Sequence, residues 1–194
     1  CAAVSAIRWG SSSTMHDSHG QKQARRPDFV FRTLATPIGD MTLAFDGGGA
    51  LCMAEFADCV ERTERWLERR PGRSHPQRLG GGRDAASAFA AYFAGDLRAL
   101  DAIPICLTGT PFQNEVWTAL REIPPGSTFG YGAFAERLGR QQAARAVGHA
   151  NGTNPLSIVV PCHRLVGAGG ALTKYGGGLE RKRWLLDHEA RYAA

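Results

Sequence analysis

The stretch Ser157-Ile-Val-Val-Pro-Cys-His-Arg-Leu-Val166 decides how this chain is interpreted. Ile158, Val159 and Val160 are apolar and β-branched, which predicts a buried, extended strand over residues 157–160. Pro161 has no N–H to donate to a sheet, so we expect the strand to end there. The sequence therefore predicts that Cys162 lies at a rigid corner after a buried strand.

The two residues that follow the corner bear on the chemistry of the thiol. A cysteine attacks as its thiolate, and a neighbouring His or Arg lowers its pKa; His163 and Arg164 come directly after Cys162. Adjacent side chains point in different directions, so His163 could assist only if the backbone turns or a water bridges the two groups. The alternative is that Cys162 is a small buried packing residue.

The composition is that of an ordinary globular protein. The chain has 194 residues, 43% hydrophobic and 21% charged, which fits one large domain or two small ones. No apolar run reaches the length of a membrane span, and no secretory signal stands out. Five widely spaced cysteines argue against a disulfide framework or a short-spaced zinc motif. We expect a cytoplasmic protein that is not bound to membranes and uses no metal or other cofactor.

Positive charge is concentrated at the two ends of the chain. Residues 108–194 carry 10 Lys/Arg against 6 Asp/Glu, net +4, whereas residues 28–107 carry 9 against 11, net −2. Residues 1–27 carry 4 against 1, net +3, show no periodicity, and are expected to form a disordered basic tail. A basic C-terminal half favours a polyanionic partner such as nucleic acid.

Residues 28–107 predict an α/β domain. The expected elements are strands over 29–34, 41–45 and 51–56, a surface helix over 61–70, a loop over 71–82, a helix over 85–94 and a strand over 103–107. Phe89, Tyr92 and Phe93 share one face of the second helix. No catalytic pattern is evident in this domain, and its three cysteines are interpreted as packing residues.

Residues 108–194 predict a mainly α domain. Thr110 is a suitable N-cap with Pro111 at the first helical position, and Pro124-Pro125-Gly126 ends that helix. A second helix ends at Gly139 and a third covers 141–151, and three short helices joined by tight turns fit a helix-turn-helix. Small residues fill the third helix around Arg145, which suits close packing on another helix or on a groove wall.

The segment after Cys162 predicts a hairpin turn over 167–170, a loop over 172–178 and a closing helix over 179–191. Leu185 and Leu186 define the inner face of that helix, and Glu189 falls on the same face. A buried carboxylate needs a partner, and we expect it to be His163. A carboxylate at the surface edge is the alternative.

Together these residues resemble the O6-alkylguanine-DNA alkyltransferases over residues 28–190. The strongest motif is Pro161-Cys162-His163-Arg164 after the apolar run. The other matching segments occur in the family's order: Thr36 to Gly39, Phe112, Val116-Trp117, Ile123-Pro124, Tyr131, Ala144 to Gly148, Asn154-Pro155 and Leu172 to Glu189. The resemblance implies an α/β fold, in which a ribonuclease-H-like α/β domain over 28–107 precedes a mainly α winged-helix-turn-helix domain over 108–194.

The resemblance also implies an activity, namely irreversible, single-turnover transfer of an alkyl group from O6-alkylguanine, or from O4-alkylthymine, in flipped-out DNA to Cys162. His163 and Glu189 would complete a Cys–water–His–Glu relay, and Asn154 would brace the cysteine turn. Arg145 would fill the gap left in the base stack.

The implied DNA-binding set is Arg145, Tyr131, Ala144, Gly148 and Asn151, with Tyr131 also in the catalytic set. The implied substrate pocket is Tyr175, Val160, Pro161, Leu165, Lys174 and Gly176. The implied partner is double-stranded DNA containing alkylated guanine, bound through the minor groove by a monomer with little sequence preference.

Two departures and two alternatives remain. Lys174 stands where relatives usually have a small residue, which puts activity on bulky O6 adducts in question. Asn151 is polar where some members are apolar.

A helix-turn-helix protein could bind alkylated DNA without transfer, as relatives lacking the cysteine do. A cysteine hydrolase using Cys162 and His163 would need an oriented base and an oxyanion hole, which adjacent Cys and His do not provide.

Overall fold

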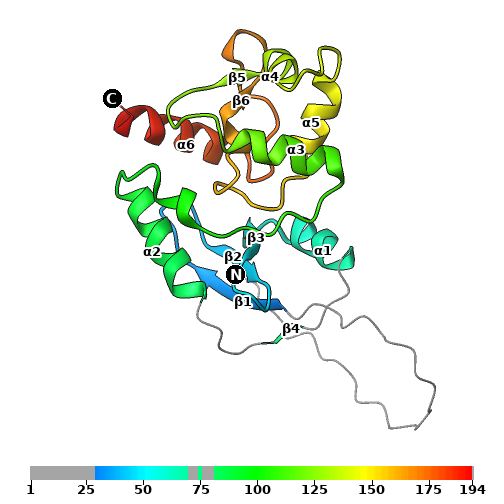
Figure 1. The fold of residues 1–194 in the computed structure, drawn as a ribbon. Helices are drawn as coiled ribbons and strands as arrows, with labels where there is room; N and C mark the ends of the chain where they lie inside the picture. The colour runs from blue at the N-terminus through cyan, green and yellow to red at the C-terminus, as the bar shows by residue number, and fades with distance from the viewer. Residues whose placement is uncertain (1–28, 70–73, 76–80, 194) are drawn as a thin grey trace, which may run out of the picture.

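The computed structural model describes residues 29–69, 74–75 and 81–193. In Figure 1, residues 29–107 form one layer, called here the N-terminal region, and residues 108–193 form a second layer, the C-terminal region. The expected basic tail over 1–27 and most of the expected loop over 71–82 lie outside the described residues. No helix in the described part of the chain is long and apolar enough to cross a membrane.

The N-terminal region is built on an antiparallel meander. Strands β1 (Phe29–Leu34), β2 (Met41–Phe45) and β3 (Leu51–Phe56) pair in succession, as the sequence predicts. The short strand β4 (Ser74–His75) adds parallel to β1, so the sheet order is β3-β2-β1-β4. Gly39 closes the first turn at φ 114°, a conformation that glycine adopts without the steric cost a side chain would add.

Two helices accompany the sheet at the positions expected for them. Helix α1 (Val60–Glu68) agrees with the predicted surface helix, although its Trp66 is buried against Phe29, with ring centroids 4.9 Å apart. Helix α2 (Gly81–Phe93) begins at Gly81 instead of Ala85, so the expected loop is shorter and contains β4. The face of α2 that carries Phe89 and Tyr92 is buried, as its spacing predicts.

The strand expected over 103–107 is wrong. A 3-10 helix, η1 (Ala99–Ala102), precedes it, and only Ile105 forms a parallel bridge, with Leu51 of β3. Leu51 N–H donates to Pro104 O at 2.8 Å, and Cys106 N–H donates to Leu51 O at 2.9 Å. Pro104 itself has no N–H with which to extend the ladder.

The C-terminal region is mainly helical, as predicted. Its helices are α3 (Pro111–Leu120), α4 (Tyr131–Arg137), α5 (Ala144–Gly152) and α6 (Leu179–Tyr192), and the short strands β5 (Phe129–Gly130) and β6 (Leu165–Val166) pair in parallel. Thr110 and Gln113 form a capping box that fixes the start of α3. Trp117 Nε1–H donates to Ala150 O at 2.8 Å, which holds α3 against α5.

The strand expected over 157–160 is also wrong, although the segment is buried. Only Leu156 bridges the sheet, at Ala54, and the chain then turns, with Val160 N–H donating to Leu156 O at 2.8 Å. Ile158 has φ 71°, the left-handed conformation that costs a β-branched residue about 1–3 kcal/mol. Such strain persists only where the surroundings hold the backbone firmly, and this turn leads directly into Cys162.

A 3-10 turn replaces the hairpin expected over 167–170. Helix η3 (Ala168–Gly170) is closed by a bond of 2.8 Å from Gly167 N–H to Ala171 O. It joins no paired strands, because β6 pairs with β5 instead.

One continuous hydrophobic core joins the two regions. Leu43, Phe56 and Tyr92 of the N-terminal region belong to the same buried cluster as Leu120 and Cys162 of the C-terminal region. The cysteine turn is therefore supported from both layers.

Candidate active site

Cys162 lies at the start of a buried 3-10 turn, η2 (Cys162–Arg164), and its side chain is only 5% exposed. Its N–H donates to Val160 O at 2.7 Å, and its carbonyl oxygen accepts from Asn151 Nδ2 at 3.2 Å. The corner that the sequence predicts is present, although a turn and not a strand leads to it. The backbone of the nucleophile candidate is thus held on both sides.

Asn154 braces the turn that leads to the cysteine. Its Nδ2 donates to Val160 O at 2.9 Å, and its Oδ1 accepts from Leu156 N–H at 2.9 Å. These bonds span the turn that contains the left-handed Ile158. The geometry agrees with the bracing role that the resemblance implies for Asn154.

Glu189 of α6 is fully buried and contacts His163, as the sequence predicts. His163 Nε2 and Glu189 Oε1 are 2.9 Å apart. The same carboxylate also accepts two bonds from Arg164, from Nε at 2.9 Å and from Nη2 at 2.8 Å. Tyr92 Oη–H of α2 donates to Oε1 at 2.9 Å. The sequence did not indicate that Arg164 and Tyr92 also bind Glu189, although an Arg next to His163 is a signal for a second cation at the carboxylate.

These contacts set the protonation states of the acid and the base. Burial favours a higher pKa for Glu189. The bonds from His163 and Arg164 outweigh that effect and hold the pKa of Glu189 well below its usual range. Burial lowers the pKa of His163, and the positive charge of Arg164 adds to that effect, while Glu189 opposes it. We infer a neutral imidazole whose Nε2–H donates to the carboxylate, which leaves Nδ1 as a proton acceptor. Nδ1 has no hydrogen-bond partner among the described residues.

The Cys162 thiol is protonated in the resting site. Burial raises its pKa, while a hydrogen bond with Asn154 and the positive charge of Arg62 act in the opposite direction. A buried thiol that must become a thiolate needs a nearby base. The neutral ring of His163 is the base that this site offers.

The expected pocket residues divide into a buried set and an exposed set. Val160, Pro161 and Leu165 are buried around Cys162, whereas Lys174 and Gly176 are exposed. Tyr175 is half-buried, and its ring meets the ring of His163 edge-on at 6.4 Å.

The buried Lys182 of α6 secures the loop that carries Tyr175. Its Nζ donates to Leu165 O and, at 3.4 Å, to Thr173 O. Lys182 therefore ties the pocket loop to the strand that follows Cys162.

Helix α5 presents the exposed face that the resemblance assigns to DNA. Arg145 is exposed, and Ala144 and Gly148 are half-buried. A Cβ on Gly148 would lie 3.8 Å from the ring of Tyr131, so that ring packs against the helix. Tyr131 Oη lies 3.1 Å from Thr173 Oγ1, which links α5 to the pocket loop.

Asn151 does not lie on that exposed face. Its side chain is buried, and its Nδ2 donates to Cys162 O. Asn151 is therefore not on the exposed face of α5, and its contact with DNA stays a prediction. Asn151 lies 11 residues before Cys162 in the chain, and its side chain holds the backbone of that cysteine.

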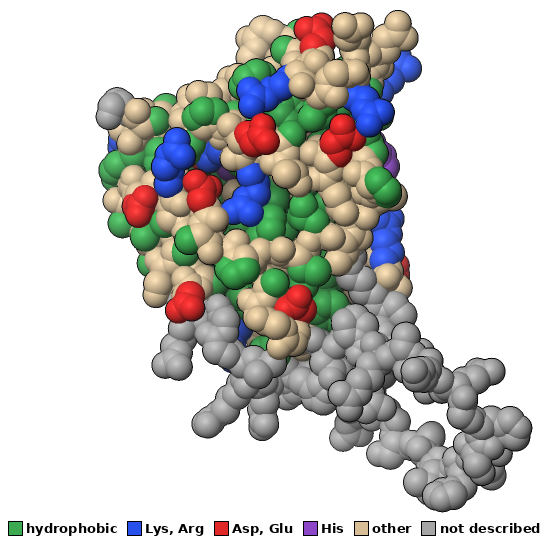
Figure 2. Space-filling model, viewed as in Figure 1, with side chains coloured by type: hydrophobic (Ala, Val, Ile, Leu, Met, Phe, Trp, Pro, Cys, Tyr) green, Lys and Arg blue, Asp and Glu red, His purple; other side chains and the backbone are tan. Residues whose placement is uncertain are grey.

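A groove of about 530 Å³ runs between the two regions on the side of α1 and α3. It is lined by Arg62, Arg65 and Arg69 of the N-terminal region and by Gln113, Asn154 and other residues of the C-terminal region. On the face drawn in Figure 2, acidic and basic side chains are interspersed among hydrophobic and other groups, so this face is not uniformly basic.

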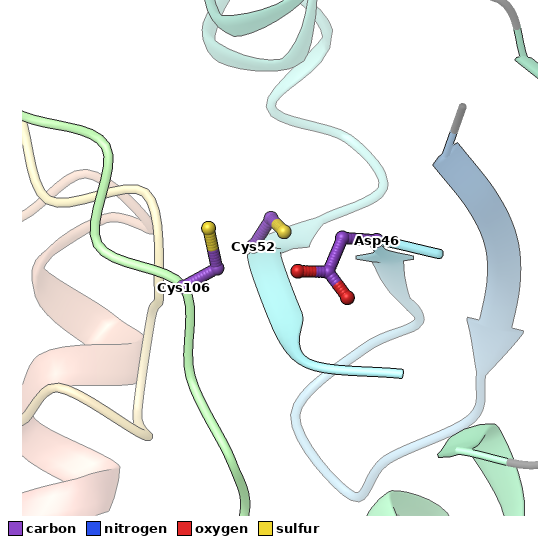
Figure 3. A group of neighbouring side chains, drawn as sticks. All are labelled: Asp46, Cys52 and Cys106. Carbon is purple, nitrogen blue, oxygen red and sulfur yellow. The ribbon is translucent and has the colours of Figure 1, made fainter. Parts of the chain in front are cut away.

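Asp46, Cys52 and Cys106 meet at this groove (Figure 3), with their oxygen and sulfur atoms within 4.8 Å of one another. Such donors suit a soft cation, but Asp46 Oδ1 already accepts from Gly48 N–H and Ala50 N–H, both at 2.9 Å. The cluster forms because Leu51 and Ile105 are paired, which the spacing of the cysteines does not reveal.

Comparison with known proteins agrees with this geometry. Residues 111–191 match the family described as "6-O-methylguanine DNA methyltransferase, DNA binding domain". A methylated-DNA–protein-cysteine methyltransferase of Shigella flexneri is 44% identical over 158 residues, which cover 80% of this chain and 92% of the relative.

Solved structures from Mycobacterium tuberculosis show the same fold. Its O6-methylguanine methyltransferase is 41% identical with a TM-score of 0.69, covering 86% of this chain and 95% of that one. A structure of that organism's OGT in complex with DNA is 42% identical with a TM-score of 0.69, covering 84% and 93% of the two chains.

The fold and the site define a protein with a buried cysteine beside a His–Glu pair, within a helical unit that matches a DNA-binding domain. At these identities and coverages, the chain belongs to the methylated-DNA–protein-cysteine methyltransferase family.

Proposed function

We propose that the protein repairs alkylated DNA by moving the alkyl group from guanine O6 to its own Cys162, once per molecule. The observation that carries this proposal is the buried thiol beside a neutral His163, whose ring is held by Glu189. The names of the relatives, which are methyltransferases acting on methylated DNA and a protein cysteine, support it.

The chemistry begins with loss of the thiol proton. His163 Nδ1 accepts it through a bridging water, and Glu189 together with Arg164 holds the ring in place while it becomes charged. The thiolate attacks the alkyl carbon, the bond from that carbon to O6 breaks, and the electron pair passes to the guanine oxygen. A proton restores the guanine, and a thioether remains on Cys162.

The protein gains access to O6 by rotating the nucleotide out of the duplex. This extrusion costs a few kcal/mol, and a side chain that fills the gap offsets part of that cost. Arg145, exposed on α5, is the residue for this role, because its guanidinium can stack on bases and bind phosphate. Tyr131 would lie near the phosphate of the rotated nucleotide, and α5 would enter the minor groove.

The proposal also covers the architecture and the partner. The N-terminal region would be a ribonuclease-H-like domain, and the C-terminal region a winged helix-turn-helix domain. The protein would act as a monomer in the cytoplasm, on double-stranded DNA with little sequence preference. O4-alkylthymine would be a second substrate, and the exposed Lys174 would narrow the pocket entrance for bulky adducts.

Intact-mass analysis after incubation with an O6-methylguanine duplex tests the function. We expect one added methyl group per protein, on the peptide that contains Cys162. Cys162→Ala should gain no mass and still bind DNA. Multiple turnover, or a methyl group on Cys52, Cys59 or Cys106, would refute the assignment of Cys162 as a single-use acceptor.

A further inference from the structure

Arg62 belongs to the N-terminal region, yet it contacts the segment that leads to the cysteine. From α1, its Nη1 donates to Gly152 O at 2.9 Å and its Nη2 donates to Asn154 O at 2.8 Å. Its Nε pairs with Glu55 of β3. The side chains of Arg62 and Glu55 are 22% and 2% exposed, so the pair is largely withdrawn from water.

Glu55 contacts the other end of the same segment. Ser157 Oγ–H donates to Glu55 Oε1 at 3.1 Å, and Phe56 N–H donates to the same oxygen at 3.2 Å. The pair therefore spans residues 152–157, which join the end of α5 to the turn before Cys162. Asn154, whose backbone oxygen Arg62 binds, is also the residue whose side chain braces that turn.

Arg62 also lies directly against the pocket loop. A Cβ built on Gly176 would lie 2.6 Å from Arg62 Cζ and 2.8 Å from Nη1, so a larger residue there would require the guanidinium or the loop to shift. One side chain thus contacts the end of α5, the residue that braces the cysteine turn and the loop that bears Tyr175.

The charges around Cys162 make the role of Arg62 electrostatic as well as steric. Besides His163, the neighbouring base in η2, the charged or titratable groups that influence the thiol are Arg62 from α1, Glu55 from β3, Lys182 from α6 and Tyr175 from the pocket loop. Of these, Arg62 and Lys182 favour the thiolate and Glu55 opposes it.

We propose that Arg62, held by Glu55, is a positioning residue through which the N-terminal region fixes the cysteine turn and the pocket loop for attack by Cys162. Its guanidinium also places positive charge beside the thiol. The consequence for repair rests on the proposed alkyl transfer, whereas the effect on the thiol can be measured without DNA.

The test combines two measurements on the full chain. The first is the single-turnover rate of transfer from an O6-methylguanine duplex and from free O6-benzylguanine. The second is the pH dependence of carboxamidomethylation of Cys162 by iodoacetamide, read from the mass of its peptide. Arg62→Ala should slow transfer to both substrates by about 10- to 100-fold, the size expected for loss of charge-assisted hydrogen bonds. It should also move the midpoint of the Cys162 pH profile to higher pH.

Three further variants separate positioning from charge and from folding. Arg62→Lys keeps the charge but cannot bind both carbonyl groups in the same way, so its pH midpoint should stay near wild type while transfer remains slow. The double variant Glu55→Gln/Arg62→Met removes both charges and leaves no unpaired carboxylate, which protects the fold, and it should transfer as slowly as Arg62→Ala. Arg65→Ala, on the same helix but exposed and paired only with Glu61 in the described structure, is the matched control and should behave as wild type.

An unchanged transfer rate and an unchanged pH midpoint in folded Arg62→Ala would overturn the inference, as would a loss confined to duplex DNA. If Arg62→Ala does not fold, as judged by circular dichroism, wild-type transfer by Arg62→Lys would overturn the inference. Failure of the proposed function would give a different result. The wild type would gain no alkyl mass, while the pH midpoint for reaction of Cys162 with iodoacetamide would still differ between wild type and Arg62→Ala.

Discussion

Arg164 and Glu189 are joined by two parallel charge-assisted hydrogen bonds, Nε to Oε2 at 2.9 Å and Nη2 to Oε1 at 2.8 Å. His163 reaches the same carboxylate at Oε1. Because Arg164 already balances the negative charge, Glu189 can orient His163 without making it a cation. A carboxylate that faced His163 alone would favour the charged ring, which could not accept a proton from Cys162.

The first prediction concerns Arg164→Ala. Without the guanidinium, the pKa of His163 should rise, so the ring should hold its proton to higher pH and lose its capacity as a base. Transfer measured at pH 7 should slow, and its rate should increase with pH over a range shifted upward from wild type. Single-turnover kinetics from pH 6 to 9 check this, on condition that the variant is folded.

The free energy of unfolding gives a second test of the role of Arg164. Removing one partner of a buried ion pair costs about 3–5 kcal/mol, because the remaining charge is left unpaired. Arg164→Ala should therefore unfold at much lower urea concentration. Arg137→Ala, which removes an exposed pair with Glu122, should change the unfolding midpoint little. Equal losses in the two variants would contradict the importance of burial.

The second prediction is loss of stability in acid. The folded-state pKa values of His163 and Glu189 both lie below their usual values of 6.5 and 4.5. The unfolded chain therefore binds these protons first, so stability is present above those pH values and is lost as the pH falls. The decline should begin below about pH 6.5 and steepen below about pH 4.5.

Urea unfolding at successive pH values measures that decline. Glu189→Gln should lose most of the steeper part below about pH 4.5, since it removes the buried carboxylate. Glu180→Gln, at an exposed site in the first turn of α6, should retain it. A wild-type profile in Glu189→Gln would show that other carboxylates govern acid unfolding.

The segments whose structure the sequence predicted correctly carry local signals. Thr110 followed by Pro111 fixes the start of α3, and the apolar spacing of α2 identifies its buried face. Glu189 on the inner face of α6 required a partner, and His163 is one of its partners, beside Arg164 and Tyr92. The cap and the buried helix faces are each encoded within one turn or one helix.

The parts that the sequence did not predict depend on distant contacts. A run of β-branched residues predicts a strand, but the hydrogen bonds that Asn154 donates to Val160 O and accepts from Leu156 N–H hold residues 157–160 as a turn with Ile158 left-handed. Arg62 and Gly152 are 90 residues apart in the chain, so no local pattern could indicate their contact. Asn151 was placed on the DNA-facing side of α5 because the resemblance does not show which way its side chain points.

The third prediction concerns the glycine beside Arg62. In Gly176→Ala, the new Cβ would meet a guanidinium that Glu55, Gly152 and Asn154 already hold, so either the loop or the arginine must move. Transfer should slow on duplex DNA and on free O6-benzylguanine alike, as measured in single-turnover assays.

A matched control is available for this substitution. Gly132→Ala lies in α4, and its new Cβ would meet nothing within 4 Å, so its transfer rate should equal that of wild type. Full activity in Gly176→Ala would show that Arg62 yields easily, and would weaken the view that it is firmly held.

The fourth prediction separates DNA handling from chemistry at Arg145. Its side chain is exposed on α5 and has no role in holding Cys162 in the described structure, so Arg145→Ala should fold normally. Transfer from an O6-methylguanine duplex should slow, because the extruded nucleotide loses the side chain that fills its gap. Transfer from free O6-benzylguanine should stay near wild type, since a free base needs no extrusion.

Salt dependence distinguishes gap filling from phosphate binding at this residue. If Arg145 inserts into the base stack, the variant should lose affinity for duplex DNA while the slope of log K against log salt stays nearly unchanged. If it binds a phosphate instead, the slope should become shallower by about 0.9, the contribution of one phosphate in duplex DNA. Fluorescence-anisotropy titrations at several salt concentrations give the slope, with Arg183→Ala of α6 as an exposed control. An equal loss of rate on duplex and free base would show that Arg145 supports the pocket and not the extruded state.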